Sequence, residues 1–130
     1  MSNTVFTDNA LLSAKLGKTN YTAPANVYFG LSTTTPSTAG TGVTEPSGGA
    51  YARVAVPGSS WNAPSAGSAT NSAAITFPTA SASWGTVTYV VAYDAITAGN
   101  LLWFSSITAQ AVASGVTVSI PAGSATDSLS

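Results

Sequence analysis

Short segments in which apolar and polar residues alternate with a period of two recur along this chain, and they constrain its fold most strongly. In the first of them, Val27, Phe29 and Leu31 share one face. Glycine, proline, serine and asparagine cluster between the segments, where turns are expected. The predicted strands are residues 27–33, 51–56, 73–77, 86–94, 101–106 and 116–120. We therefore predict an all-β protein, a β-sandwich of the jelly-roll type.

One short helix is predicted near the amino terminus, over residues 8–17. Asp8 is a suitable N-cap, and Leu12 and Leu16 lie four residues apart on one face. A helix this short needs a docking surface to persist. It could be a lid over one end of the β-core, which we favour, or an arm that grips a neighbour. With 130 residues, the chain is expected to form a single domain, residues 1–130, with this helical arm.

The alternation also predicts which side chains form the core. In the strongest strand, 86–94, Val87, Tyr89, Val91 and Tyr93 should face the same way. The predicted core consists of Phe29, Leu31, Val54, Ile75, Phe77, Val87, Tyr89, Val91 and Val118. The last residues, 125–130, are expected to add a short edge strand.

Charge is scarce, and its scarcity excludes several functions. The chain has three Lys or Arg residues, four Asp or Glu residues, and neither His nor Cys. Three cations cannot neutralise a row of phosphates, so nucleic acid is not an expected partner. Metal sites and catalysis built on His or Cys are impossible. We expect no catalytic residues, no cofactor and no metal.

The sequence carries no sign of membrane association. No apolar stretch approaches the roughly 20 residues that span a bilayer, and no signal peptide is recognisable. We therefore expect no membrane partner and synthesis in a cytoplasm. A surface with so few charges is expected to be covered by copies of the chain or by another protein.

Large aromatic residues are the first candidates for such an interface. Trp61 lies within a long polar loop and is predicted either to anchor a neighbouring subunit or to fold back on its own core. Tyr28 and Tyr51 are further candidates. Together with Trp61 they could instead line a carbohydrate platform.

Arg53, the sole arginine, is the remaining interface candidate. It could pair with Glu45 or Asp94 inside the subunit, or reach across an interface. Asp94 ends a strong strand just before a turn. We therefore expect Asp94 to cap that turn rather than to act as a catalytic acid.

Several segments, in order along nearly the whole chain, resemble small virion proteins of tailed phages. The matching segments are Asn9-Ala10-Leu11-Leu12, Tyr21-Thr22-Ala23-Pro24, Val27-Tyr28-Phe29-Gly30-Leu31-Ser32-Thr33-Thr34, Thr44-Glu45-Pro46-Ser47-Gly48-Gly49-Ala50-Tyr51-Ala52-Arg53-Val54, Ile75-Thr76-Phe77-Pro78, Trp84-Gly85-Thr86-Val87, Asp94-Ala95 and Gly99-Asn100-Leu101-Leu102. The resemblance implies a non-enzymatic structural role in a phage virion.

Such proteins include capsid cement or decoration subunits and tail-fibre-like proteins. Our leading expectation is a cement protein on the surface of the phage head. Its partners would be the major capsid protein and copies of itself, arranged as a trimer. A tail-fibre or baseplate component is the alternative within the virion. A carbohydrate-binding module is the alternative from a different class.

Overall fold

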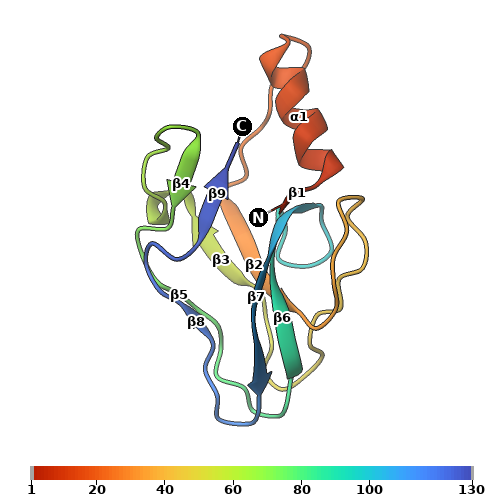
Figure 1. Ribbon diagram of the computed structural model, residues 1–130, viewed down its shortest axis with the longest axis vertical. Helices are drawn as coiled ribbons and strands as arrows, with labels where there is room; N and C mark the ends of the chain where they lie inside the picture. Colours follow the sequence, from red (N-terminus) through yellow and green to blue (C-terminus); the bar gives the residue numbers. More distant parts are fainter. Residues whose placement is uncertain (1, 130) are drawn as a thin grey trace.

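The computed structural model describes residues 2–129, and it consists of antiparallel strands with one α-helix (Figure 1). The elements are β1 (Ser2–Asn3), α1 (Val5–Lys15), β2 (Asn26–Ser32), β3 (Val54–Pro57), the short 3-10 helix η1 (Gly58–Ser60), β4 (Ser68–Thr70), β5 (Ile75–Thr76), β6 (Gly85–Tyr93), β7 (Leu101–Val112), β8 (Ser119–Ile120) and β9 (Thr126–Ser128). The prediction of an all-β protein with one short helix is therefore confirmed. Met1 and Ser130, the ends of the expected domain, lie outside the described residues.

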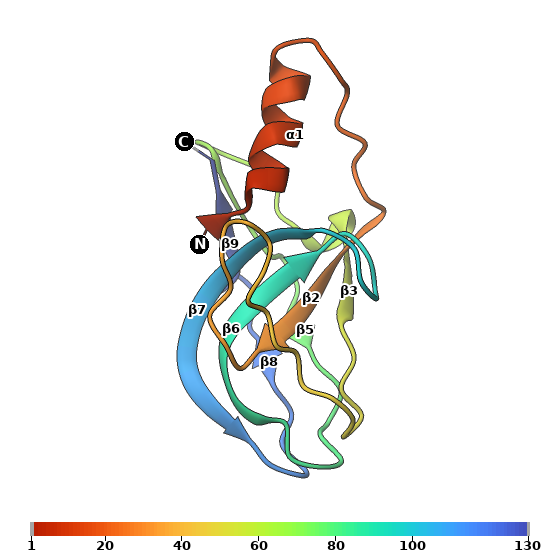
Figure 2. The same ribbon diagram turned by 90° about the vertical axis from the view of Figure 1, so that its right-hand side faces the viewer.

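The strands form one large sheet and two small ones. The large sheet has the order β1-β7-β6-β2-β3, with all neighbours antiparallel, while β4 pairs with β9 and β5 pairs with β8. The small sheets lie over one face of the large sheet (Figure 2). A jelly roll has eight strands in two sheets of comparable size. The observed order does not confirm that more specific prediction.

The predicted strand boundaries hold best where both neighbours of a strand are other strands. β2 and β6 each lie within one residue of the predicted ranges. β7 runs on to Val112, because its second half pairs with the start of β6, where Gly85 opposes Val112. β3 begins only at Val54, where its pairing with β2 ends opposite Phe29. The N–H of Leu31 donates instead to the Tyr51 hydroxyl, and the chain turns at Ala50, which has a φ of 65°. The pattern of alternation does not reveal such a turn.

The main core lies between the large sheet and the segments that carry β5 and β8. It includes Phe29 and Leu31 from β2, which are completely buried, and Phe77 and Val118 from the covering layer. Of the predicted core residues, seven are buried, namely Phe29, Leu31, Ile75, Phe77, Val87, Val91 and Val118. Val54 and Tyr89 are only half-buried.

The expectation that four side chains of β6 face one way is wrong. The register between β6 and β7 shifts between Val87 and Tyr89. Val87 therefore belongs to the main core, whereas Tyr89, Val91 and Tyr93 pack into a second cluster. A local bulge changes the face to which the following residues point.

The predicted start of the helix is also wrong. Thr4, not Asp8, is the N-cap, and its hydroxyl oxygen accepts a hydrogen bond from the Thr7 N–H at 3.4 Å. Asp8 instead lies in the first turn, where a negative charge is favourable. Lys15 is the last helical residue, and Gly17 follows with a φ of 74°, as expected after a helix end.

Replacement of Phe77 by alanine tests the core. Phe77 is 2% exposed, and we expect Phe77→Ala to lower the free energy of unfolding by about 3–5 kcal/mol. Phe6→Ala is the matched control, because Phe6 is 43% exposed, and it should cost less than about 1 kcal/mol. Denaturant titration of both variants measures the difference. Equal losses would contradict the assignment of Phe77 to the core.

Candidate functional site

The helix stands away from the β-sheets at one end of the molecule (Figure 1). None of its residues is buried. Four large apolar side chains of this region, Val5, Phe6, Leu12 and Leu16, are between 43% and 67% exposed. An apolar helix face normally packs against another element. The favoured prediction of a lid does not describe this helix, and its geometry is that of an arm.

The base of the arm is held rigidly to the large sheet. Thr4 is 1% exposed, its N–H donates to the Leu102 carbonyl at 3.0 Å, and its hydroxyl donates to the Leu101 carbonyl at 2.5 Å. The Thr7 hydroxyl also donates to the Leu102 carbonyl, at 2.7 Å. The N–H of Val5 donates to the Thr38 carbonyl at 2.8 Å. These bonds fix the direction in which the exposed apolar side chains point.

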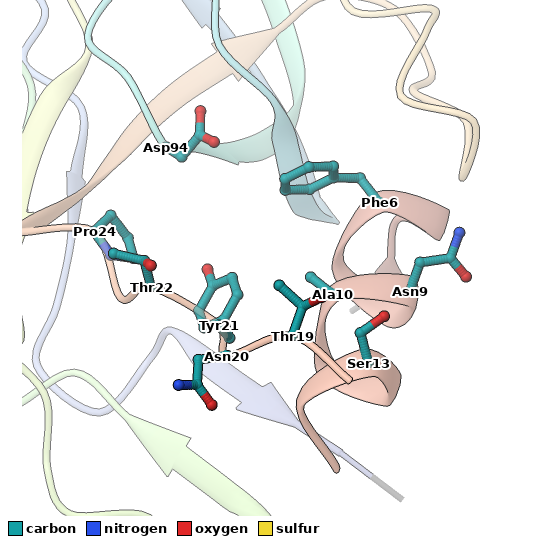
Figure 3. Close-up of a pocket in the computed structure, with 10 residues that line it drawn as sticks. All are labelled: Phe6, Asn9, Ala10, Ser13, Thr19, Asn20, Tyr21, Thr22, Pro24 and Asp94. Carbon is teal, nitrogen blue, oxygen red and sulfur yellow. The ribbon is translucent and has the colours of Figure 1, made fainter. Parts of the chain in front are cut away.

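A groove of about 580 Å³ separates one side of α1 from the chain that follows it. Figure 3 shows Phe6 and Ser13 projecting from the helix, Tyr21 across from them, and Asp94 beyond. Burial, with a smaller contribution from the charge of Asp94, raises the pKa of Tyr21. The Tyr21 hydroxyl is protonated at neutral pH, as an ordinary tyrosine is, and can donate a hydrogen bond.

A second groove, of about 340 Å³, lies on the other side of the arm and is more apolar. Leu11, Trp61, Trp103 and Leu129 contribute to its walls. The carboxyl group of Asp127 also lines it, and its Oδ1 is buried without a hydrogen-bond partner within residues 2–129. Burial raises the pKa of Asp127, although a hydrogen bond from the Ser128 backbone partly opposes the rise.

Trp61 folds back on its own core. Its ring centroid lies 5.9 Å from that of Phe29 and 6.5 Å from that of Trp103, and the side chain is half-buried. Of the two predicted arrangements, the structure contains the intramolecular one, although part of the ring still lines the second groove. Contact of Trp61 with another subunit stays a prediction.

Arg53 is engaged inside the subunit. Its Nη2 donates to Glu45 Oε2 at 2.7 Å, and its Nε donates to Glu45 Oε1 at 3.0 Å. Nη1 donates to the carbonyls of Ala95 and Ala98, each at 2.8 Å. The guanidinium carbon also lies 3.6 Å from the centroid of the Tyr93 ring, within range of a cation–π interaction. Few of its N–H groups are left for a partner.

Tyr51 belongs to the same cluster. Its hydroxyl donates to Glu45 Oε1 at 2.6 Å and accepts from the Leu31 N–H at 3.0 Å. Burial and the hydrogen bond to Glu45 strongly raise the pKa of Tyr51. Gly30 is required beneath this cluster, because a Cβ at that position would lie 2.7 Å from Glu45 Oε1.

Tyr28 lies apart from Trp61, on the opposite face of β2. It is half-buried and packs against the second cluster, opposite Tyr93. The predicted interface residues therefore do not form one surface. Tyr51 and Trp61 pack against the main core, Tyr28 packs against the second cluster, and Arg53 lies over Tyr93 of that second cluster. Asp94, as predicted, caps its turn: its Oδ1 accepts from the Asn100 N–H at 2.7 Å.

The sequence places Leu12 and Leu16 on one helix face and allows for an arm, but the predicted interface residues, Trp61 and Arg53 among them, do not include the helix. Val5 and Phe6 precede the predicted helix start, so they were not included in an amphipathic pattern. The threonine pair Thr4 and Thr7 was the available signal, since threonine three residues before a helical N–H is a favourable N-cap.

Within residues 2–129, no group of three or more acidic residues gathers to hold a metal ion. No described helix is long and apolar enough to cross a membrane.

A charge-poor β-protein with a rigid, apolar arm has the features of a structural component of a larger assembly. A family model matches residues 1–127, and the chain belongs to that family, which is described as podophage GP4 fiber I protein gp80. The match confirms the resemblance to structural proteins of phage virions and indicates that this protein is part of a virion. No curated protein matches the chain.

The Glu45–Arg53 pair should make stability depend on pH. Burial alone would raise the pKa of Glu45, but hydrogen bonds from Arg53 and Tyr51 and the charge of Arg53 outweigh it and lower that pKa below 4.5. The fold therefore favours the ionised carboxylate, so this stabilisation is present above pH 4.5 and disappears as the pH falls through the lower, folded-state pKa.

We expect Glu45→Gln to lower the free energy of unfolding by about 3 kcal/mol at neutral pH, because it leaves the buried Arg53 without its counter-ion. The difference from the wild type should shrink in acid. Asp127→Asn is the control, because the pKa of Asp127 is raised and its pH effect should have the opposite sign. Denaturant titrations between neutral and acidic pH measure both variants. A difference for Glu45→Gln that does not change with pH would contradict the role of the ion pair.

Proposed function

We propose that this chain is a non-enzymatic structural subunit of a phage tail fibre. The match of residues 1–127 to a family described as a fibre protein carries this proposal. The same match favours the tail-fibre alternative over the expected capsid cement. A fibre subunit needs a rigid body and surfaces that hold neighbours. The threonine-anchored arm and the ion-paired loops are consistent with that requirement.

The helix end is the proposed attachment surface. It combines exposed apolar side chains with a fixed direction, and apolar burial supplies about 25 cal/mol for each Å² removed from water. Only Asp8, Lys15 and Lys18 carry charge on or just beyond the arm. Attachment through this surface would therefore depend on apolar contact rather than on ion pairs. Its partner would be a copy of the chain or a neighbouring virion protein.

Location and copy number in purified particles test the proposed function. We expect antibodies against this chain to label the tail, and quantitative mass spectrometry to find far fewer copies than of the major capsid protein. Labelling over the whole head, with hundreds of copies per particle, would contradict a fibre role. That result would support a capsid cement bound to the major capsid protein.

A salt wash tests the nature of the attachment. At 1 M sodium chloride the Debye length is about 3 Å, and exposed ion pairs, worth about 0–1 kcal/mol each, weaken further. We expect the protein to cosediment with particles in both low and high salt. Quantitative release by 1 M salt alone would contradict apolar attachment.

Two variants of the arm sharpen this measurement. The double variant Phe6→Ser, Leu16→Ser removes two exposed apolar side chains and should release the protein at either salt concentration. The control variant Lys15→Gln, Lys18→Gln removes two charges from the same end and should remain bound. Release of the lysine variant with retention of the serine variant would mean that charge holds the subunit.

A further inference from the structure

The outer edge of β7 is open along most of its length. β7 pairs with β6 on one side, but on the other side β1 covers only Trp103 and Phe104. Within the described chain, the backbone of residues 105–111 forms no hydrogen bond outside β6, apart from a 3.5 Å contact between the Ser105 hydroxyl and the Ser106 carbonyl. Figure 2 shows β7 as the outer margin of the sheet, from β1 to the far end of the molecule.

This edge lacks three of the features with which proteins usually protect an open strand, namely short length, charge and proline, although its register against β6 is irregular at residues 107–109. Such strands are normally short, or carry lysine or proline that opposes pairing with another chain. Here β7 is the longest strand, with 12 residues, and residues 105–111 read Ser-Ser-Ile-Thr-Ala-Gln-Ala without a charge or a proline. Ser106 and the four residues 108–111 are also exposed, so their backbone is accessible from the side.

The chemistry of an open edge defines what can bind there. Its N–H and C=O groups are accessible to water in the isolated subunit, and their spacing matches that of a second extended backbone, as in the known mode of recognition by strand addition. β1 already uses this mode within the chain, since Ser2 and Asn3 pair with the same edge just above the open part. A segment added below β1 would continue that line.

The irregular register of β7 favours a flexible segment over a second copy of this chain. Between the pairs Val87–Gln110 and Tyr89–Ser106, three residues of β7 oppose one residue of β6. In a dimer with a two-fold axis, residues 105–111 of one copy could pair antiparallel with the same residues of the other copy. The irregular stretches of both copies would then face each other at Thr108, on the axis. A flexible extended segment can follow the curved edge, whereas a second rigid edge with the same irregularity cannot.

We propose that the outer edge of β7, residues 105–111, is a binding site for an extended segment of a different polypeptide chain of the virion, which joins the sheet beside β1. The backbone of the segment supplies the pairing groups, and its side chains project to the two faces of the sheet. This site is separate from the helix end, and its existence does not depend on how the arm is attached.

Amide hydrogen exchange tests the site directly. In the isolated subunit the outward-facing amides of residues 105–111 should exchange rapidly. In purified particles we expect their exchange to slow at least tenfold, since strand addition gives them acceptors. The turn at residues 113–115 is the internal control and should exchange equally fast in both samples. Unchanged exchange at residues 105–111 in particles would overturn the proposal.

The isolated subunit also separates this partner from a second copy. Protection of residues 105–111 that rises with the concentration of the isolated subunit would mean self-pairing and would overturn the assignment to a different chain. In particles, a photo-crosslinking residue at Ala109 should join this chain to an extended segment of another virion protein, identified by mass spectrometry. Crosslinks only between copies of this chain would likewise overturn it.

Substitutions at Thr108 provide an independent readout. Thr108→Lys places a charge on the open edge and should lower incorporation into particles at least tenfold, whereas Thr108→Val should be incorporated like the wild type. Ser124→Lys, in an exposed turn away from the edge, controls for added charge. Normal incorporation of folded Thr108→Lys would overturn the proposal. If the Phe6→Ser, Leu16→Ser variant stays in particles with residues 105–111 still protected, the helix surface is not needed for attachment, and the proposal for the β7 edge stands.

Discussion

The ion pair between Glu45 and Arg53 joins the middle of the long loop 33–53 to the end of the same loop and to the turn 94–100. Glu45 lies within the loop and Arg53 at its end, just before β3, and the carbonyls of Ala95 and Ala98 that complete the arginine belong to the turn. Because the arginine side chain is only 7% exposed, water cannot replace the carboxylate. A loop of this length therefore has one arrangement instead of many.

Because Glu45 and Arg53 pair with each other, they contribute little charge to the surface. With two of the few ionic groups paired in the interior, the exterior relies on hydroxyl, amide and small apolar groups. Two places then differ from an ordinary protein surface, namely the arm with its exposed apolar side chains and the open edge of β7. Both present chemistry that water satisfies only in part. That combination is consistent with the proposed function as a structural subunit of a virion.

The sequence predicts strand boundaries best where a strand has other strands on both sides. It predicts side-chain partners worst where the partner lies far away in the sequence. The sequence alone does not decide whether Arg53 pairs with Glu45, with Asp94 or with a partner chain, because nothing local distinguishes two carboxylates on different loops. The sequence alone also does not decide whether Trp61 packs on its own core or anchors a neighbouring subunit. A ring in a polar loop can pack inward only if the fold leaves a site beside Phe29 and Trp103, and that site is made by three separate segments.

The sequence by itself determined the all-β class, the buried faces of β2 and the scarcity of charged groups, since these follow from alternation and composition within short windows. It also determined the turn at Asp94, which depends on contacts a few residues away. The tertiary structure alone decided that the helix projects as an arm, because the direction of its base is set by the bonds from Thr4 to the carbonyls of Leu101 and Leu102 far along the chain. It alone decided the change of face within β6 and the open edge of β7, because strand register depends on both strands of a pair and cannot be deduced from one.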